Sequence, residues 1–309
     1  MMRKFVFLCI IFPFTILAQT LLLEENFNYT ENTNLTNYGW VAHSGAGNLP
    51  IQVVALGLSY PNYPPSNQGN AAALTGTTSS AEDVNKNFSE QNSGSVYAAF
   101  MVEITSAATT GTYFIHLGPT SLTTIFRGRI FVENDGSENL AFGVSKSSTS
   151  TISYTPYQYS LNTVYLIVFK YTFNPGAADD ELFLWINPDF SGSEPSALVS
   201  QTDGGSDAEN LGTVALRQGI PTSGIPSPGL IIDGIRISTS WESLFSGAAM
   251  NPPVISNITQ TPQIPESTDM VTITADVTDD GTVNEVKLFY SVDSAPFDST
   301  NMTLTSGDT

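Results

Sequence analysis

Short stretches rich in β-branched and aromatic residues follow one another along most of this chain, separated by Gly, Asn, Asp, Ser and Pro. This pattern is typical of antiparallel strands joined by turns. No stretch keeps a sustained helical period, and only residues 240–245 indicate one short helical turn. We therefore predict strands at residues 95–104, 111–117, 125–132, 140–145, 163–173, 181–187 and 230–238.

Two of these strands indicate how the sheets are covered. In residues 164–171 (VYLIVFKY) both alternating sets are apolar, which predicts a central strand covered on both faces. In residues 181–187 (ELFLWIN) one face carries Leu182, Leu184 and Ile186, and the other face carries Phe183 and Trp185. The first face is predicted to enter the core, and the second carries aromatic rings towards another part of the protein. Residues 19–248 are thus predicted to form an all-β, two-sheet antiparallel jelly-roll sandwich whose first and last strands are neighbours.

A domain boundary is predicted at residues 247–253 (GAAMNPP), a linker of small residues and proline. After it, residues 270–276 and 285–292 are predicted strands joined by a DDGT turn. About 59 residues hold too few strands to close a sandwich. Residues 249–309 are therefore expected to contain a linker and a truncated, incomplete Ig-like or fibronectin-III-like β-sandwich, and the chain is expected to be a fragment.

The first eighteen residues have the pattern of a signal peptide. Arg3 and Lys4 precede an apolar run from Phe5 to Leu17, too short to span a bilayer, and the small residue Ala18 precedes the polar boundary. We predict a secreted or cell-surface protein with no membrane insertion after cleavage. Cys9 is the only cysteine, so the mature chain would contain neither a disulfide nor a thiolate metal site.

The charge balance excludes one large class of partners. Removing Arg3 and Lys4 leaves eight basic residues against 29 acidic ones, a formal net charge of −21. A field of that sign repels nucleic acid and anionic lipid surfaces. We therefore predict no nucleic-acid partner.

Two terminal segments of the predicted sandwich resemble a known family. Residues 21–29 (LLLEENFNY) and 231–245 (IIDGIRISTSWESLF) resemble the first and last strands of concanavalin A-like/LamG-type jelly rolls, with Gly234 where that family usually has an acidic residue. The segment from Asn251 resembles the Ig-like repeats of bacterial surface proteins. Together with the leader, this arrangement looks like a secreted protein of the Bacteroidetes type. The resemblance implies a jelly-roll fold in a larger multidomain protein.

The motifs of the common hydrolases are absent. The sequence contains no E-x-D-x-x-E strand pattern, no H-E-x-x-H and no G-x-S-x-G, so the prediction from sequence is that the protein is not an enzyme. His116 is expected to be a satisfied sheet histidine. The acidic segments 179–181 and 203–209 adjoin small turn-forming residues and are interpreted as solvated loops; the second is the better candidate for calcium.

Asp233 is the carboxylate that most needs an explanation. Strand alternation places it with Ile231, Ile235 and Ile237, the expected core face, where an unpaired charge is costly. Three interpretations stay open. Asp233 accepts hydrogen bonds from the backbone of the N-terminal strand, it ligates a structural calcium together with Glu25, or it lies at an exposed kink. No cofactor other than such a calcium is expected.

Aromatic residues in loops or on the non-core face are the best candidates for ligand recognition. A sugar ring stacks on Trp or Tyr, and nearby amides or carboxylates bind its hydroxyls. The alternative is that these rings only cover strand edges. The candidate ligand-binding residues are Trp40, Tyr60, Tyr63, Tyr157 and Trp185.

The function predicted from these features is adhesion or carbohydrate binding by a secreted or cell-surface module, with a polysaccharide or cell-surface glycan as partner. The alternative is that the chain is the N-terminal accessory region of a secreted hydrolase. The identity of the ligand and the oligomeric state stay open.

Overall fold

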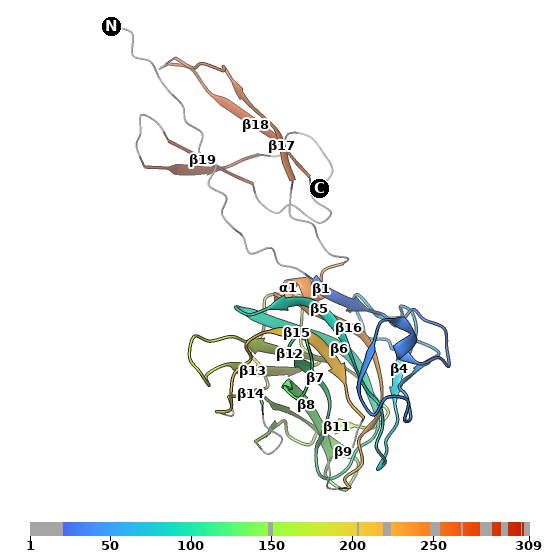
Figure 1. The fold of residues 1–309 in the computed structure, drawn as a ribbon. Coiled ribbons are helices and arrows are strands. Elements are labelled where there is room, and N and C mark those ends of the chain that lie inside the picture. Colours follow the sequence, from blue (N-terminus) through green and yellow to red (C-terminus); the bar gives the residue numbers. More distant parts are fainter. Residues whose placement is uncertain are drawn as a thin grey trace. The chain divides into compact units, whose positions relative to one another are not determined.

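The computed structural model describes residues 21–147, 151–202, 204–218, 224–247, 254–266, 268–278, 286–291, 296–303 and 305. The predicted signal peptide at residues 1–18, the proline-containing part of the predicted linker and the DDGT turn lie outside the described residues. The chain forms two compact units, Gln19–Gly247 and a unit containing Ala248–Thr309, and each is described by itself (Figure 1).

The unit Gln19–Gly247 consists of two eight-stranded antiparallel sheets that pack face to face (Figure 1). In sheet A the strands are, in spatial order, β14 (Val199–Gln201), β13 (Glu181–Ile186), β12 (Val164–Thr172), β6 (Ser95–Ser106), β16 (Gly229–Ser238), β4 (Ala71–Leu74) and β3 (Gln52–Val54), with β1 (Leu21–Glu25) also paired to β16. In sheet B the order is β10 (Ser153–Tyr154), β9 (Asn139–Ser145), β8 (Arg127–Asn134), β7 (Thr112–Gly118), β15 (Leu211–Leu216), β5 (Asp83–Gln91) and β2 (Val41–Ser44), with β11 (Tyr159–Ser160) paired to β9.

This architecture confirms the predicted all-β sandwich. All seven strands predicted for this unit are present, and β1 pairs with β16, so the first and last strands of the sandwich are neighbours. The strand β12 is central as predicted: Ile167 and Phe169 face the core between the sheets, and Leu166 and Val168 face a second cluster on the outer face of sheet A. The only helices in the described residues are the 3-10 turn η1 (Leu35–Tyr38) and α1 (Trp241–Phe245), which begins after the predicted turn residue Ser240.

The strand β16 holds sheet A together because it has different partners along its length. One edge pairs with β6, while the other pairs first with β4, at Leu230–Ile232, and then with β1, from Ile235 onwards. A β-bulge lies at the change of partner, where Gly234 has φ +59°. A Cβ atom on Gly234 would lie 2.7 Å from Cβ of Pro65 and 2.9 Å from Cε of Met101. This position therefore requires glycine.

The bulge also corrects the predicted face of Asp233. Ile232 faces the core between the sheets and so do Ile235 and Ile237, because the extra residue shifts the alternation by one. Asp233 thus lies with Ile231 on the outer face of sheet A, separated from the two isoleucines with which simple alternation had grouped it. It is nonetheless fully buried.

Asp233 is buried because the loop between β3 and β4 covers it. Its Oδ2 accepts the backbone N–H of Leu58 at 2.7 Å, and its Oδ1 accepts that of Gly234 at 2.6 Å. The hydroxyl of Tyr63 donates to the Gly234 carbonyl oxygen at 2.7 Å. The hydrogen-bond interpretation of Asp233 therefore fits, with the donors supplied by this loop and by the bulge itself instead of by the N-terminal strand.

A second cluster of buried side chains lies on the outer face of sheet A, where α1 and the loops before β4 and after β13 pack on the strands. This packing accounts for the aromatic face of β13, because Trp185 contacts Trp241 of α1 at 5.3 Å between ring centroids. We call the set the outer cluster; its buried members are Leu58, Tyr63, Tyr97, Ala99, Met101, Leu166, Val168, Trp185, Trp241 and Leu244.

The C-terminal unit contains two separate antiparallel pairs of strands within the described residues. The strand β17 (Val254–Thr261) pairs with β18 (Thr272–Thr278), and β19 (Lys287–Tyr290) pairs with β20 (Asp298–Asn301). The predicted strands at 270–276 and 285–292 correspond to β18 and β19, which belong to different sheets. The Ig-like or fibronectin-III-like assignment stays a prediction.

Replacing Asp233 with Ala is expected to lower the free energy of unfolding by about 1–3 kcal/mol, because the N–H groups of Leu58 and Gly234 lose their acceptor. Urea denaturation at fixed pH measures the change. The matched control is Glu31→Ala, an exposed carboxylate, which should change stability by less than about 0.5 kcal/mol. Equal effects of the two substitutions would contradict this role of Asp233.

The stability difference between the protein and its Asp233→Asn variant should depend on pH. Burial raises the pKa of Asp233 to about 7, although the two N–H donors lower it. Between the unfolded pKa of about 4 and the folded pKa, the folded chain keeps a proton that the unfolded chain has released. Raising the pH across this window should therefore destabilise the native protein relative to the variant, by at most about 1.4 kcal/mol per pH unit. A difference that stays constant from pH 4 to pH 8 would show that the carboxyl does not titrate in this way.

Candidate functional site

Two of the predicted ligand-binding residues are buried, so those two predictions are wrong. Trp40 is 2% exposed, and its indole N–H donates to Oε2 of Glu25 at 3.2 Å. Tyr63 is also 2% exposed and belongs to the outer cluster. Neither ring presents a face to solvent, so neither can stack on a sugar in this structure.

The Glu25 carboxylate accepts hydrogen bonds from several protein donors. It is therefore not available as the calcium ligand that was predicted. Its carboxylate accepts the N–H of Phe27 at 2.8 Å, the hydroxyl of Tyr29 at 2.7 Å and the indole N–H of Trp40, and it pairs with the ammonium of Lys86. These donors occupy the lone pairs that a calcium ion would need. The predicted pairing of Glu25 with Asp233 as ligands has no support, since both carboxylates are held by protein donors.

Trp185 and Tyr157 occupy different surroundings. Trp185 is 2% exposed, and its indole N–H donates to the Pro195 carbonyl at 2.9 Å, so its main contribution is to packing. Tyr157 is exposed, and its hydroxyl donates to Oε1 of Glu133 on β8 of sheet B. This hydrogen bond raises the pKa of Tyr157 to about 12. Tyr157 is not close to the other candidates, and the structure does not combine it with them into one site.

Tyr60 is the predicted residue that lines a hollow. The ring is half-exposed in the loop before β4 and faces a depression of about 670 Å³ over the outer cluster. The opposite wall comes from the loop after β13, with Phe190, and from the end of α1, with Phe245. We call this depression the aromatic hollow; it is lined by Tyr60, Pro61, Asn62, Pro188, Asp189, Phe190, Ser191 and Phe245.

The aromatic hollow combines apolar rings with polar groups at its rim. Phe190 and Phe245 are stacked, with ring centroids 4.3 Å apart and planes inclined by 8°. The side chains of Asn62, Asp189 and Ser191 are exposed beside these rings. This is a mixture of flat apolar surface and hydrogen-bonding groups that suits a ligand with both kinds of surface.

Sequence analysis did not identify Phe190 and Phe245 as site residues. Phe190 lies in the segment NPDFSG at the start of the loop after β13, and its turn composition gave no sign of a contact with the distant loop at Tyr60. Phe245 was recognised only as part of the short helical turn. The two phenylalanines and Tyr60 are brought together by packing on sheet A, which no local pattern encodes.

A half-buried ion pair holds the other side of the loop after β13. Lys170 of β12 lies 2.5 Å from Oε1 of Glu194, and the Tyr97 hydroxyl donates to Oε2 of the same carboxylate at 2.5 Å. The ammonium of Lys170 also lies 4.5 Å from the ring centroid of Phe183. These contacts hold the segment that carries Phe190 against the sheet.

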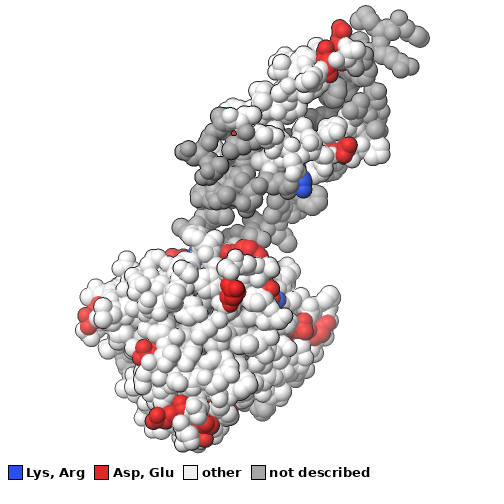
Figure 2. Space-filling model, turned by 180° about the vertical axis from the view of Figure 1, so that it is seen from behind, with Lys and Arg blue, Asp and Glu red and all other residues white. Residues whose placement is uncertain are grey.

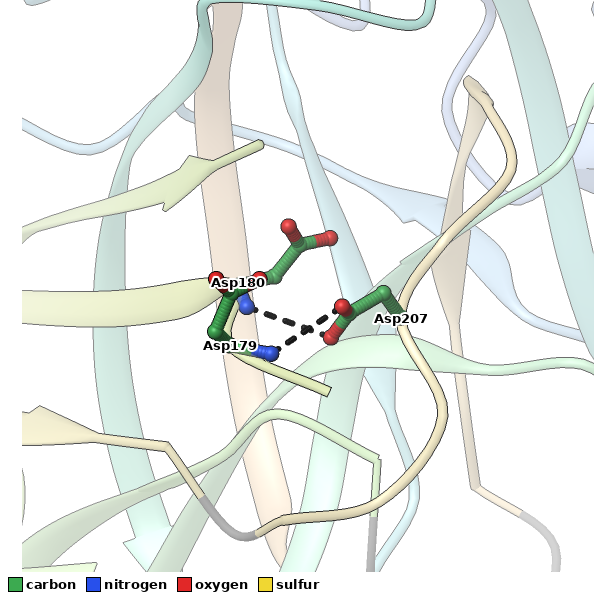
Figure 3. Close-up of side chains that lie close together, drawn as sticks. All are labelled: Asp179, Asp180 and Asp207. Atoms are coloured by element: carbon green, nitrogen blue, oxygen red, sulfur yellow. Dashed lines mark hydrogen bonds between the residues drawn. The ribbon is translucent and has the colours of Figure 1, made fainter. Parts of the chain in front are cut away.

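Two acidic segments that sequence analysis treated separately meet in the structure. Asp179 and Asp180, before β13, and Asp207, before β15, offer oxygens that all lie within 4.8 Å of one another. Figure 3 shows the Asp207 carboxylate pointing at the backbone N–H groups of Asp179 and Asp180, which donate at 3.1 and 3.2 Å. Fully buried Lys146 donates to the same carboxylate at 2.6 Å.

These contacts identify the acidic group as an internal ion-pair network. Burial favours a higher pKa for Asp207, but the ammonium of Lys146 and the two N–H donors hold that pKa below its usual value. Asp180 in turn accepts the Tyr171 hydroxyl at 2.7 Å and the N–H of Asn174 at 2.6 Å. The ammonium of Lys146 thus supplies the positive charge that a metal ion would otherwise bring to the Asp207 carboxylate.

Charged side chains are few on the face of the unit Gln19–Gly247 that Figure 2 shows. In the view of Figure 2, acidic atoms form small separate patches on the unit Gln19–Gly247 and basic atoms are almost absent. None of the helices in the described part of the chain is long and apolar enough to span a bilayer.

Comparisons with known proteins show no family for this chain. No family model matches it, and no curated protein matches it. Among solved structures it is similar to domain 4 of an extracellular arabinanase from Geobacillus stearothermophilus in complex with arabinotriose, with 14% identity, a TM-score of 0.43, and coverage of 74% of this chain and 100% of that one. It is also similar to an alginate lyase variant in complex with alginate tetrasaccharide, with 13% identity, a TM-score of 0.40, and coverage of 71% and 97%.

A third similar structure is an endo-1,3-β-glucanase from Streptomyces sioyaensis, with 9% identity, a TM-score of 0.39, and coverage of 72% of this chain and 96% of that one. The sequence-based prediction that the protein is not an enzyme is corrected by these findings. It rested on the absence of three motifs, and an alginate lyase and an endoglucanase are among the structures with a similar sandwich. Each of the three motifs belongs to one class of hydrolase, so their absence alone does not exclude catalysis.

Replacing Lys146 with Met should lower the free energy of unfolding by roughly 2–3 kcal/mol, because the Asp207 carboxylate loses its buried cation. Chemical denaturation measures the loss, and the double variant Lys146→Met with Asp207→Asn should recover part of it. Added calcium should not raise the melting temperature of the unmodified protein. A calcium-dependent rise that disappears in Asp207→Asn would show that the acidic group is a metal site after all.

Proposed function

We propose that the unit Gln19–Gly247 binds carbohydrate in the aromatic hollow. The observation that carries the proposal is the meeting of Tyr60 with Phe190 and Phe245 from two other segments, with exposed amide, carboxylate and hydroxyl groups beside them. This combination matches the two kinds of surface on a sugar ring. The proposed partner is therefore a glycan. We also propose that the protein is exported, because its first eighteen residues have the pattern of a signal peptide.

The rings supply the apolar part of the interaction. A pyranose or furanose ring has one face of C–H groups, which packs on an aromatic face. Tyr60 and Phe190 are half-exposed, so each offers part of its surface without a change in the fold. Phe245 contributes to the floor but also contacts Trp241, with ring centroids 5.0 Å apart, and its main role is to hold α1.

The polar rim supplies orientation. Asn62 offers both a donor and an acceptor to sugar hydroxyls, and Asp189 offers carboxylate oxygens. Asp189 already accepts the backbone N–H and the hydroxyl of Ser191, at 2.9 and 2.7 Å. These bonds hold the carboxylate in place and lower its pKa, so that it stays ionised at neutral pH. A site of about 670 Å³ is within the usual size of small-ligand sites.

The aromatic hollow is open to solvent and does not enclose its contents. This favours an internal stretch or a branch of a glycan over a small enclosed metabolite. Its floor is rigid, because Tyr63 and Trp241 beneath it are buried. A preformed floor reduces the ordering cost of binding. Adhesion through such a glycan is a further expectation that depends on the same binding.

Tyr60→Ala and Phe190→Ala are each expected to weaken glycan binding by about fivefold or more, the loss of one stacking contact of about 1 kcal/mol. The measurement is a glycan array on the purified protein, followed by calorimetric titration of the best neutral oligosaccharide. Melting temperatures of the variants should stay close to that of the unmodified protein, because both rings are half-exposed.

Tyr157→Ala is the matched control, since it removes an exposed tyrosine from the other sheet. Its affinity should equal that of the unmodified protein. The proposal fails if no neutral glycan binds, or if Tyr157→Ala weakens binding as much as Tyr60→Ala does.

A further inference from the structure

A second group of polar side chains lies on the outer face of sheet B, away from the core between the sheets. It contains both histidines of the chain, His43 on β2 and His116 on β7. It also contains Tyr113 on β7, Arg129 on β8 and Arg217 directly after β15, so two of the four arginines of this unit lie here. We call these five residues the polar face cluster.

The side chains of the polar face cluster are in mutual contact around Tyr113. The guanidinium carbon of Arg217 lies 4.2 Å from the Tyr113 ring centroid, and that of Arg129 lies 5.3 Å from it. The ring centroid of His116 lies 5.8 Å from that of Tyr113 and 6.1 Å from that of His43. Residues from three strands and from the segment directly after β15 thus converge on one patch.

His116 presents an unsatisfied acceptor. The side chain is fully buried, and Nδ1 lies 3.0 Å from the Leu117 carbonyl oxygen, so the ring proton is on Nδ1 and Nε2 carries a lone pair. Nε2 has no hydrogen-bond partner among the described residues. Burial, assisted by nearby positive charge, lowers the pKa of His116 to about 3, and the ring therefore stays neutral at neutral pH. Nε2 can therefore accept a hydrogen bond from a ligand or a water molecule.

Arg217 brings a positive charge to this patch, with its guanidinium against the Tyr113 ring. The residue is 8% exposed, yet within the described part of the chain its guanidinium forms no ion pair with a carboxylate. Its hydrogen bond to the Tyr113 carbonyl oxygen is long, at 3.4 Å. A buried cation without a counter-charge is costly, so a bound anion would stabilise this arrangement.

We propose that the polar face cluster binds an acidic sugar residue, a uronate, with its carboxylate on Arg217 and a hydroxyl donating to Nε2 of His116. A guanidinium and a carboxylate match as a bidentate pair. A neutral sugar would leave Arg217 without a counter-charge. A fully ionised inorganic anion such as sulfate would leave Nε2 without a donor.

His43 and the neighbouring Phe126 are both half-buried, so a ligand of the polar face cluster would approach beside them. The Phe126 ring lies 4.3 Å from the His116 ring between centroids and 6.1 Å from that of His43, so the two half-exposed rings border the solvent side. This site is separate from the aromatic hollow, because it lies on sheet B and the hollow lies over sheet A. It adds an acidic component to the glycans that the protein would recognise.

The test is calorimetric titration of the purified protein with trigalacturonate, with its methyl ester and with sulfate. The methyl ester keeps the ring and its hydroxyls but has no charge. Trigalacturonate should bind about tenfold or more tightly than the ester and than sulfate. In ¹⁵N spectra, the Nε2 signal of His116 should shift when trigalacturonate is added, because that nitrogen gains a hydrogen bond.

Two substitutions at Arg217 separate recognition from folding. Arg217→Gln should weaken trigalacturonate binding by about tenfold or more, and Arg217→Lys, which keeps the charge but not the planar fork, by a smaller factor. Lys287→Gln in the C-terminal unit removes one positive charge elsewhere and should leave the affinity unchanged. If Arg217→Gln does not fold, Arg217→Lys alone carries the test.

Three results would overturn the proposal: no binding of trigalacturonate, equal binding of the methyl ester, or unchanged affinity in the folded Arg217 variants. Tyr60→Ala distinguishes this proposal from the aromatic hollow. If Tyr60→Ala abolishes trigalacturonate binding and Arg217→Lys does not, the acidic glycan binds in the hollow and the uronate site on sheet B is wrong. If neutral glycans fail to bind but trigalacturonate binds through Arg217, the aromatic hollow is wrong and this site stands.

Discussion

The change of partner along β16 is the constraint on which the rest of this sandwich depends. A strand that pairs first with β4 and then with β1 leaves a gap in the hydrogen-bonding of its edge. Gly234 absorbs the extra residue of the bulge, and Asp233 fills the gap by accepting the N–H groups of Leu58 and Gly234. Without these acceptors, two buried donors would be unsatisfied at the centre of sheet A.

The same contact positions the candidate site. Leu58 lies in the loop that carries Tyr60, and Tyr63 in the same loop donates to the Gly234 carbonyl. The loop is thereby held on the outer face of sheet A, where Phe190 and Phe245 complete the aromatic hollow. Tyr60 lies two residues after Leu58, whose N–H binds the buried carboxylate of Asp233, so stability and recognition are coupled at this point.

Periodicity predicted the strands that alternate or are apolar on both faces, and it predicted the aromatic face of β13 correctly. It missed β5 (DVNKNFSEQ), which is polar for a strand that is paired on both sides in sheet B. There Lys86 turns inward to pair with buried Glu25 on β1, a contact between residues 61 apart in the sequence. Strand alternation also predicted the wrong face for Asp233, because the bulge shifts the register of β16. A single glycine in the sequence is a weak indication of such a bulge.

The candidate site was predicted only in part, for a related reason. Tyr60 was identified from its loop composition, but Trp40 and Tyr63 have the same kind of local sequence and are buried. Whether a loop tyrosine faces solvent depends on which distant segment packs against it. Likewise Arg217 and His116 come from strands about a hundred residues apart, and only the order of strands in sheet B brings them together.

The central claim is that Asp233 anchors a loop whose Tyr60 binds glycan in the aromatic hollow. The most direct measurement is a map of backbone amide shifts by NMR when the best neutral oligosaccharide from the array is added. The account predicts shifts concentrated at Tyr60–Asn62, at residues 189–191 and at Phe245, and their loss in Asp233→Ala under conditions where that variant is folded. Shifts confined to sheet B, or an undiminished response in Asp233→Ala, would contradict it.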